Sequence, residues 1–296
     1  MIKKSPIYVK FLILSLLLLT SCVSGCVTIN NKEPVSEEIL PRHAFVQIQH
    51  SVEVEGCGID AKTGEEKCQK AVMQYVSSGS YVFHSEVSQG TSYVLTAGHS
   101  CESKFPKSQM IDGYRVENKG SKFKTADLNG FQHEAEVVLI NRRFDLCLLR
   151  VYNVITNPPV LKLADKEPKR GETVTNMAAP HGLFWPGTVL VFKGQFSGYH
   201  DRGYYVYTIP TKPGSSGSPI INKGNNLVGV IFAGYKMIEN VGLSSPLVAI
   251  RVFLKKAIAK GEMELWEKNN TPRLNTQVDR IWIEKMTHKL NQVFGQ

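Results

Sequence analysis

The chain has 296 residues, of which 42% are hydrophobic and 21% charged, and this composition is typical of a globular protein. Its length suits one two-lobed domain of roughly 200–250 residues with short extensions. The formal net charge is +9. Three lysines among the first ten residues contribute to this charge, and the chain contains no Lys/Arg run. The absence of such a run argues against nucleic-acid binding. Because the His and Cys residues are scattered without paired-ligand spacing, we expect no metal and no cofactor.

Residues 1–21 have the pattern of an export signal. Basic residues precede the apolar run Phe11–Leu19, which is far shorter than the roughly 18–20 apolar residues that span a bilayer. The run ends in Leu-Thr-Ser-Cys, which resembles the lipobox of bacterial lipoproteins. This resemblance implies cleavage before Cys22, acylation of Cys22, and anchoring to the cell envelope, at the outer membrane facing the periplasm in a Gram-negative host. Cys26 is the alternative lipidation site, and an ordinary secretory signal is the alternative interpretation. Residues 22–41 are predicted to form a polar tether.

The next segment, 42–152, is predicted to be the first lobe of the domain. Apolar and polar residues alternate at 45–49 and 51–55, as in half-buried strands. Cys57 and Cys68 bracket a turn-like sequence. Since an exported protein meets oxidising conditions, we expect a disulfide that closes this hairpin.

Two segments of this lobe place a polar side chain at the end of an apolar strand. The strand Thr91–Ala97 runs into a turn that presents His99, and Asp145 lies directly before the strand 146–151. Asp127 is a rival acid, but it lies in a turn sequence, where Asp usually forms local hydrogen bonds. Asp145 is therefore preferred.

Two further cysteines follow these polar residues at the same spacing, since Cys101 and Cys147 lie two residues after His99 and Asp145. If His99 and Asp145 meet, the two cysteines come near each other. We favour two small buried side chains over a disulfide.

The second lobe, predicted at 171–248, contains the most informative segment. Gly214-Ser215-Ser216-Gly217-Ser218-Pro219 lies between the apolar strands 204–209 and 227–232. Glycines allow a sharp turn, so main-chain N–H groups can face a developing oxyanion. A serine in such a turn needs a general base and an orienting acid, and the chain supplies a His and an Asp.

Three motifs, Thr-Ala-Gly-His, Asp-Leu-Cys-Leu-Leu and Gly-Ser-Ser-Gly-Ser-Pro, occur in the chain order His, Asp, Ser. Together they resemble the trypsin-like (chymotrypsin-fold) serine proteases, nearest to the bacterial HtrA-type and glutamyl-endopeptidase branches. The resemblance covers about Arg42 to Lys256. It implies an all-β fold of two six-stranded antiparallel β-barrels in a protease domain at 42–260, with a closing C-terminal helix. It also implies a serine endopeptidase acting on envelope or extracellular proteins.

The resemblance assigns roles to individual residues. It implies that Ser216 is the nucleophile, His99 the general base and Asp145 the residue that orients the imidazole. It also implies that the backbone N–H groups of Gly214 and Ser216 form the oxyanion hole. Ser215 replaces the aspartate that pairs with a new amino terminus in zymogen-activated relatives, so no such activation is expected.

The specificity pocket is expected to involve Pro210, Thr211 and the segment Phe232-Ala233-Gly234. No acidic residue lies at its base, which argues against cleavage after Lys or Arg. Thr211 resembles a glutamyl-endopeptidase threonine, but Ile231 stands where those enzymes carry a histidine. Since such a pocket offers no partner for a desolvated charge, a small or apolar substrate side chain is preferred.

The remaining residues, 261–296, are predicted to form a helical extension after the closing helix at 249–260. Apolar residues recur at helical spacing in 275–294 and predict one apolar face, which packs on the protease body or meets a partner. The alternative function is a catalytically silent, protease-like binding module, since Phe232 replaces the serine that supports the aspartate in digestive relatives. An ester hydrolase of the α/β type would need a different chain order. The sequence leaves the oligomeric state open.

Overall fold

The computed structural model describes residues 39–60, 62–103, 107–235, 237–270 and 276–294. The chain divides into two units, 1–40 and 41–296, and all the strands and helices given below belong to the second. The predicted export signal, Cys22 and most of the predicted tether lie outside the described residues. None of the described helices combines the length and the apolar character needed to cross a membrane.

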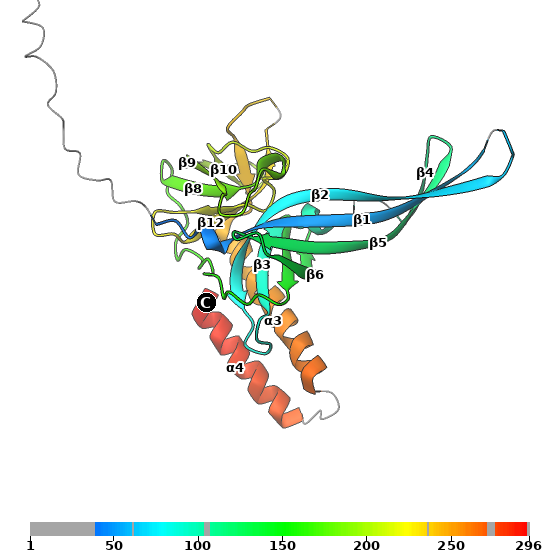
Figure 1. Ribbon diagram of the computed structural model, residues 1–296. Coiled ribbons are helices and arrows are strands. Elements are labelled where there is room, and N and C mark those ends of the chain that lie inside the picture. Colours follow the sequence, from blue (N-terminus) through cyan, green and yellow to red (C-terminus); the bar gives the residue numbers. More distant parts are fainter. Residues whose placement is uncertain (1–38, 61, 104–106, 236, 271–275, 295–296) are drawn as a thin grey trace, which may run out of the picture. The chain divides into compact units, whose positions relative to one another are not determined.

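The first half of this unit forms a closed antiparallel barrel (Figure 1). Its strands pair in the order β1-β2-β3-β7-β6-β5, and pairing between β1 and β5 closes the ring, while β4 adds to the outside of β5. The strands are β1 (Phe45–Ile59), β2 (Glu66–His84), β3 (Ser92–Ala97), β4 (Ser108–Ile111), β5 (Tyr114–Asp127), β6 (Gln132–Asn141) and β7 (Leu146–Val151). The short helices η1 (Arg42–Ala44) and α2 (Gly98–Cys101) lie before β1 and after β3.

A second closed barrel follows, with strand order β10-β13-β12-β11-β8-β9. Its strands are β8 (Thr173–Ala178), β9 (Leu190–Tyr199), β10 (Tyr205–Tyr207), β11 (Pro219–Ile221), β12 (Leu227–Gly234) and β13 (Gly242–Ser244), with the short helix η2 (Pro180–Gly182) after β8. The prediction of two six-stranded antiparallel barrels is therefore confirmed.

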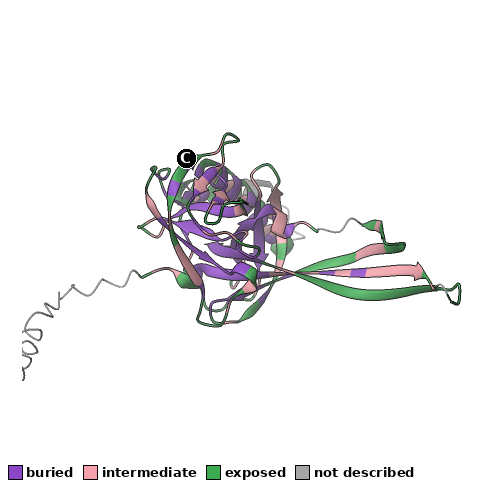
Figure 2. Ribbon diagram, turned by 90° about the horizontal axis from the view of Figure 1, so that it is seen from above, coloured by how far each residue is buried: buried purple, intermediate pink, exposed green. Residues whose placement is uncertain are grey.

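Each barrel closes around the apolar faces of its own strands. Every residue of β3 and β7 is buried, and the first barrel's core gathers Val46, Ile48, Val94 and Leu149. Figure 2 shows the buried residues concentrated in the barrels. Burial of this apolar surface is the main stabilising contribution, at roughly 25 cal/mol per Å². The ends of these strands are thus held in fixed positions.

Three strands of the first barrel continue outwards as a feature that we call the arm, made of residues 51–59 of β1, 66–76 of β2 and 114–122 of β5, with β4 at its edge (Figure 1). All residues of β2 from Glu66 to Gln74 are exposed. The disulfide predicted between Cys57 and Cys68 is present and joins directly opposed residues of β1 and β2.

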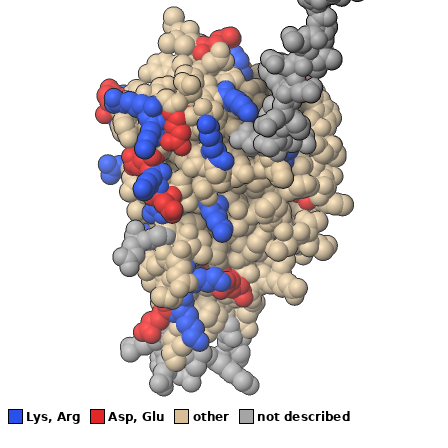
Figure 3. Space-filling view, turned by 90° about the vertical axis from the view of Figure 1, so that its left-hand side faces the viewer, with Lys and Arg blue, Asp and Glu red and all other residues tan. Residues whose placement is uncertain are grey.

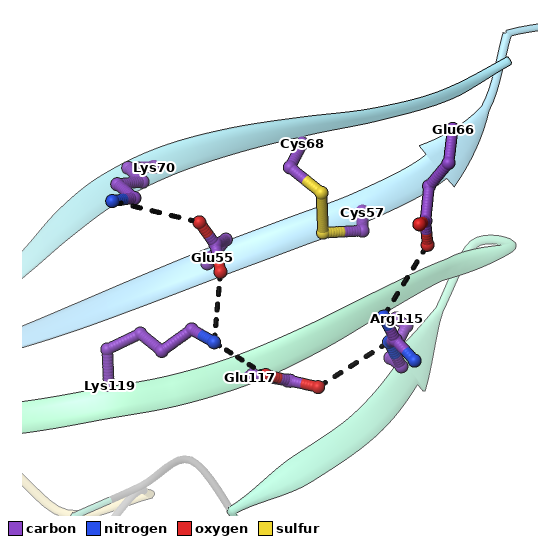
Figure 4. The surroundings of a disulfide bond; sticks show 8 residues. All are labelled: Glu55, Cys57, Glu66, Cys68, Lys70, Arg115, Glu117 and Lys119. Atoms are coloured by element: carbon purple, nitrogen blue, oxygen red, sulfur yellow. Dashed lines mark hydrogen bonds and ion pairs between the residues drawn. A yellow bond between two sulfur atoms is a disulfide. The ribbon is translucent and has the colours of Figure 1, made fainter.

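Ion pairs run across one face of the arm beside this disulfide (Figure 4). Lys119 contacts Glu117 at 2.6 Å and Glu55 at 2.9 Å, and Arg115 reaches both Glu117 and Glu66 at 3.5 Å. Exposed ion pairs contribute at most about 1 kcal/mol each. Each pair therefore adds little stability, but together the pairs link β1, β2 and β5 side by side. The disulfide closes the hairpin of β1 and β2.

Two helices follow the second barrel, as predicted. Helix α3 (Leu247–Asn270) begins near the predicted start but runs ten residues further than the predicted closing helix, and α4 (Thr276–Phe294) lies close to its predicted range. The helices contact each other through the stacked rings of Trp266 and Trp282, 5.6 Å apart. Met286, Leu290 and Phe294 of α4 are buried, which supports packing of this helix on the body.

A buried polar cluster fixes α3 to the first barrel. The hydroxyl of Tyr93 donates a 2.7 Å hydrogen bond to Glu262, which is fully buried. Arg150, also buried, donates to the carbonyl of Gly261 and to Glu264 at 2.8 and 2.7 Å. Burial raises the pKa of the Glu262 carboxyl because it penalises the charged form.

Charged side chains are unevenly spread on the face opposite the arm. Figure 3 shows basic residues interspersed with acidic ones on one half of this face, while the other half is mostly uncharged. Opposite charges that lie this close reduce each other's field.

Candidate active site

The structure brings His99 and Asp145 into direct contact. His99 follows β3 in the short helix α2, and Asp145 directly precedes β7, which pairs with β3. Asp145 Oδ2 lies 2.7 Å from His99 Nδ1, and Oδ1 accepts a 2.6 Å hydrogen bond from the backbone N–H of His99. With both carboxylate oxygens engaged, Asp145 fixes the plane of the imidazole and favours the tautomer that carries its proton on Nδ1.

A disulfide between Cys101 and Cys147 ties these two segments together. The expectation of two separate buried side chains was wrong. Contact between His99 and Asp145 brings the residues two positions further along each segment to a Cα separation of 6.4 Å, a spacing at which a disulfide forms readily. The equal spacing of the two cysteines after His99 and Asp145 is the signal in the sequence for this disulfide.

Ser216 completes a continuous chain of polar contacts. Its Oγ lies 2.9 Å from His99 Nε2, on the opposite side of the ring from Asp145. The turn that carries it needs glycine on both sides, because Gly214 and Gly217 have φ values of +94° and +85°. A Cβ at Gly217 would also lie 2.1 Å from the carbonyl oxygen of Ser78. A hydroxyl, an imidazole and a carboxylate are therefore in line, which is the arrangement that an activated nucleophile needs.

Two backbone donors lie beside this serine. Among the described residues, neither the N–H of Gly214 nor that of Ser216 makes a hydrogen bond. The carbonyl of Pro213 accepts from the N–H of His181. Since C=O and N–H point in opposite directions across a planar trans peptide, this bond turns the Gly214 N–H away from His181. The two donors are thus available to an oxyanion.

Ser78, which sequence reasoning did not single out, holds this turn from the other side. It lies in β2 and is fully buried. Its Oγ donates to the carbonyl of Gly214 at 2.8 Å and accepts from the N–H of Ala179 at 3.0 Å, and its own N–H donates to the carbonyl of Ser216 at 2.8 Å. One residue of the first barrel therefore clamps the serine turn of the second. A serine two positions before the buried strand residue Ser80 carries no distinctive sequence signal.

The neighbouring serines of the turn have structural partners. Ser215 is buried, and its N–H donates to the carbonyl of Lys212 at 2.9 Å. Ser218 is also buried, and its Oγ accepts a 2.8 Å hydrogen bond from Asn176. The turn is thus held by hydrogen bonds of its own lobe and of Ser78.

The turn before Asp145 is supported from the second barrel. Ser245 Oγ donates to the carbonyl of Phe144, and Tyr204 OH approaches the carbonyl of Arg143 at 3.4 Å. The ring of Phe232 packs edge-on against Tyr204 with centroids 4.9 Å apart. Phe232 thus packs against a residue that contacts the turn before Asp145.

Asp127 has a different role, in agreement with the prediction. Its Oδ1 accepts hydrogen bonds from the N–H groups of Asn129 and Phe131 at 3.0 and 2.9 Å. It is buried in a turn at the end of β5 and serves that turn.

Two cavities of about 320 Å³ each meet at Ser216. The first, which we call the β2 cleft, runs from Ser216 and His99 to the edge of β2, and the side chain of His181 lines it. The second, which we call the specificity pocket, is lined by Thr211, Lys212, Pro213, Ser216, Ala233, Gly234 and Tyr235. Of the residues expected there, Thr211, Ala233 and Gly234 line it, and Pro210 and Phe232 do not.

With this geometry described, the chain can be compared with known proteins. The model of the trypsin-like peptidase domain family matches residues 77–230, which is more than half of the chain and includes His99, Asp145 and Ser216. The chain belongs to this family. No curated protein matches it.

One solved structure with a TM-score above 0.5 shares the fold. A crystal structure of the serine endoprotease from Yersinia pestis superposes with a TM-score of 0.51 and 19% identity over 74% of this chain, and the match spans 64% of the Yersinia chain, less than two thirds of its length. An inactive serine-to-alanine mutant of a protein from M. tuberculosis matches with a TM-score of 0.49 and 16% identity, over 74% of this chain and 88% of that chain.

Proposed function

We propose that this protein is a serine endopeptidase in which Ser216, His99 and Asp145 form the catalytic triad. The observation that carries the proposal is the unbroken chain from Asp145 Oδ2 through both ring nitrogens of His99 to Ser216 Oγ, with contacts of 2.7 and 2.9 Å. Two unpaired N–H groups beside the nucleophile add the electrostatic element that such a reaction requires.

The reaction follows from this arrangement. Ser216 Oγ attacks the carbonyl carbon while its proton moves to His99 Nε2, and the negative charge that develops on the carbonyl oxygen is stabilised by the N–H groups of Gly214 and Ser216. The peptide C–N bond then breaks as His99 returns the proton to the amine nitrogen. Water, deprotonated by His99, hydrolyses the acyl-enzyme. Asp145 stabilises the imidazolium in both halves of the reaction.

The pocket residues favour a small or apolar side chain on the acyl side of the scissile bond. Thr211 closes the pocket against Gly234, where an added Cβ would lie 3.0 Å from the threonine Cβ. Lys212 is the one charged residue lining the pocket among the described residues, and its ammonium contacts Glu239 at 3.2 Å. Because this charge is already paired, it offers little to an acidic substrate side chain.

We further propose that the enzyme is exported and anchored to the bacterial envelope by acylation of Cys22, with envelope or extracellular proteins as substrates. The support for this step is the sequence alone, a short apolar run followed by Leu-Thr-Ser-Cys. Metabolic labelling with an alkyne palmitate analogue tests it. Label in the wild type that is lost in Cys22→Ser supports the anchor, and label that persists in Cys22→Ser but not in Cys26→Ser moves the site to Cys26.

The activity is tested with a fluorophosphonate probe, which reacts only with an activated serine. We expect the full-length protein in detergent to be labelled, and Ser216→Ala and His99→Ala to lose the label. Ser80→Ala is the matched control, since Ser80 is a buried serine whose hydroxyl has no partner among the described residues. A folded wild-type protein that takes no label would favour the alternative, a silent binding module at the envelope.

A further inference from the structure

The arm carries a long open strand edge. From Glu66 to Ser77, β2 pairs with β1 on one side, and no described strand pairs with its other side. The exposed stretch includes apolar side chains, with Val72 59% and Met73 38% exposed. Proteins usually shorten or cover such an edge because its free N–H and C=O groups bind other chains. An edge left open suggests that a chain binds there.

The hydrogen bonds at the two ends of β2 identify which backbone groups face this edge. In an antiparallel pair, successive residues direct their N–H and C=O to opposite sides. The N–H of Ser78 donates to Ser216, away from β1, whereas the carbonyl of Glu65 accepts from Asp60, towards β1. The register between β1 and β2 has no shift. The residues that face the open edge are therefore Lys70, Val72, Gln74 and Val76.

The edge is continuous with the candidate active site. The β2 cleft is lined by Gln74, Val76, His99 and Ser216, and the Ser78–Ser216 hydrogen bond closes its inner end. The specificity pocket, which takes the acyl side of the substrate, shares only Pro213 and Ser216 with this cleft and is otherwise lined by different residues. The leaving-group side of a bound polypeptide consequently passes over His99 and reaches the edge of β2.

The direction of the strand matches this path. β2 runs from the tip of the arm towards Ser78, whereas the leaving-group side of a substrate runs away from Ser216. The two chains are antiparallel. We propose that the open edge of β2 from Val76 to Lys70 binds the leaving-group side of an extended polypeptide substrate as an added antiparallel strand. The inference rests on the proposed endopeptidase function and names the substrate class, which is unfolded or extended polypeptide.

The length and side chains of the edge specify what binds. At about 3.4 Å per residue, the stretch from Val76 to Lys70 accommodates roughly six to eight substrate residues. Strand addition is read mainly through the backbone, and alternate side chains add selectivity. Val76 and Val72 lie on the same face of β2 and are 39% and 59% exposed. Because Lys70 and Gln74 lie on the same face, this face of the edge alternates apolar and polar side chains, and the edge binds its substrate mainly through the backbone.

Peptide length is the direct test. Two peptides share the same acyl side and carry either two or ten residues on the leaving-group side, and a third is the long peptide N-methylated at alternate leaving-group amides. With full-length protein, we expect kcat/KM for the long peptide to exceed that for the short one by about tenfold or more, since strand pairing is lost from the short one. N-methylation should remove this advantage.

A pair of proline variants tests the edge itself. Val72→Pro removes one outward N–H of β2 and spares the hydrogen bonds to β1, since proline is tolerated where the N–H faces solvent. Met110→Pro is the matched control, because Met110 is an exposed residue of β4, the strand at the other edge of the arm. The ratio of kcat/KM between long and short peptides should fall towards one in Val72→Pro and stay at the wild-type value in Met110→Pro.

The outcomes separate the two proposals. Equal cleavage of long and short peptides by a labelled enzyme, or a long-peptide advantage that survives Val72→Pro, overturns the strand-addition proposal and leaves the endopeptidase intact. If the cleavage rate does not depend on peptide length and the protein forms a dimer that Val72→Pro dissociates, the edge binds a second copy of the chain. That result also overturns the strand-addition proposal. Absence of both cleavage and fluorophosphonate labelling means that the proposed function itself has failed. The long peptide is also tested as a competitor of labelling, so that binding is read even when turnover is slow.

Discussion

Replacing Ser78 with alanine removes the side-chain part of the clamp on the serine turn, while the backbone N–H of residue 78 can still donate to the carbonyl of Ser216. The hydroxyl of Ser78 bridges the carbonyl of Gly214 and the N–H of Ala179, with contacts of 2.8 and 3.0 Å. Both partners are buried. In Ser78→Ala each loses its partner, and the peptide that presents the Gly214 N–H is held by fewer contacts.

The size of the effect follows from these contacts. A buried group left without a hydrogen bond costs about 1–3 kcal/mol, so we expect Ser78→Ala to lower the free energy of unfolding by roughly 2 kcal/mol or more. Complete loss of one oxyanion donor would raise the activation barrier by about 2.7–4 kcal/mol. Since the donors remain and only their alignment loosens, we expect kcat to fall by about ten- to a hundredfold, or about 1.4–2.7 kcal/mol.

The assay compares Ser78→Ala with Ser80→Ala in peptide hydrolysis and in thermal unfolding. Ser80 lies two residues further along β2 and is equally buried, but its hydroxyl has no hydrogen-bond partner among the described residues. Its replacement should therefore change kcat by less than about twofold, because no hydrogen bond is lost. The fall for Ser78→Ala should appear in kcat more than in KM, because the oxyanion forms only in the transition state.

An unchanged kcat in Ser78→Ala would contradict the proposed role of Ser78 in aligning the oxyanion donors. If Ser78→Ala lowers the melting temperature but keeps the kcat of Ser80→Ala, then Ser78 stabilises the fold without aligning the oxyanion donors. The position of the Gly214 N–H would in that case be set by the bond between His181 and Pro213 alone.

Three further predictions concern stability and specificity. Replacing Cys57 and Cys68 together with serine should lower the free energy of unfolding by up to about 3 kcal/mol, as expected for a loop of this size, and should speed proteolysis of the arm; urea unfolding and limited proteolysis measure both. The pKa of Glu262 is raised above its ordinary 4.5, so the folded state binds more protons there than the unfolded state and the wild type loses stability as the pH rises above 4.5. In Glu262→Gln this pH-dependent loss of stability should be absent. Urea unfolding at pH 4.5 and 7.5 measures the loss in both proteins, and an equal loss in the variant and the wild type would contradict the prediction. Thr211→Ala should raise kcat/KM for leucine relative to alanine on the acyl side by about fivefold or more, since each methylene in a pocket is worth about 1–3 kcal/mol. A peptide library measures this ratio, and an unchanged ratio would mean that another residue limits the size of the pocket.

The sequence predicted that His99, Asp145 and Ser216 would meet because they belong to short motifs at strand ends. His99 and Asp145 follow or precede fully buried strands, whose uniform apolar runs are easy to recognise. The glycines around Ser216 have a conformational reason that any such turn shares. These features depend on local sequence, and the closure of two barrels then brings them together.

The arm and the clamp could not be predicted in the same way. Residues 66–74 of β2 are exposed on both faces, so selection for burial leaves no alternating apolar pattern to read. The two strands predicted at 45–49 and 51–55 are a single strand, because β1 runs through His50 with an unbroken register against β2. Ser78 depends on a contact between residues 136 positions apart, which no local pattern encodes.

The position of β2 gives the arm a meaning beyond its own stability. The strand begins in solvent, passes the open edge, and enters the barrel at Ser78, whose N–H and Oγ bond to Ser216 and Gly214. The register with β1 is continuous over this whole length, so no bulge separates the edge from the clamp. A substrate paired with the edge would therefore contact the same strand that clamps the serine turn, so the strand-addition proposal places substrate binding and the clamp on one element.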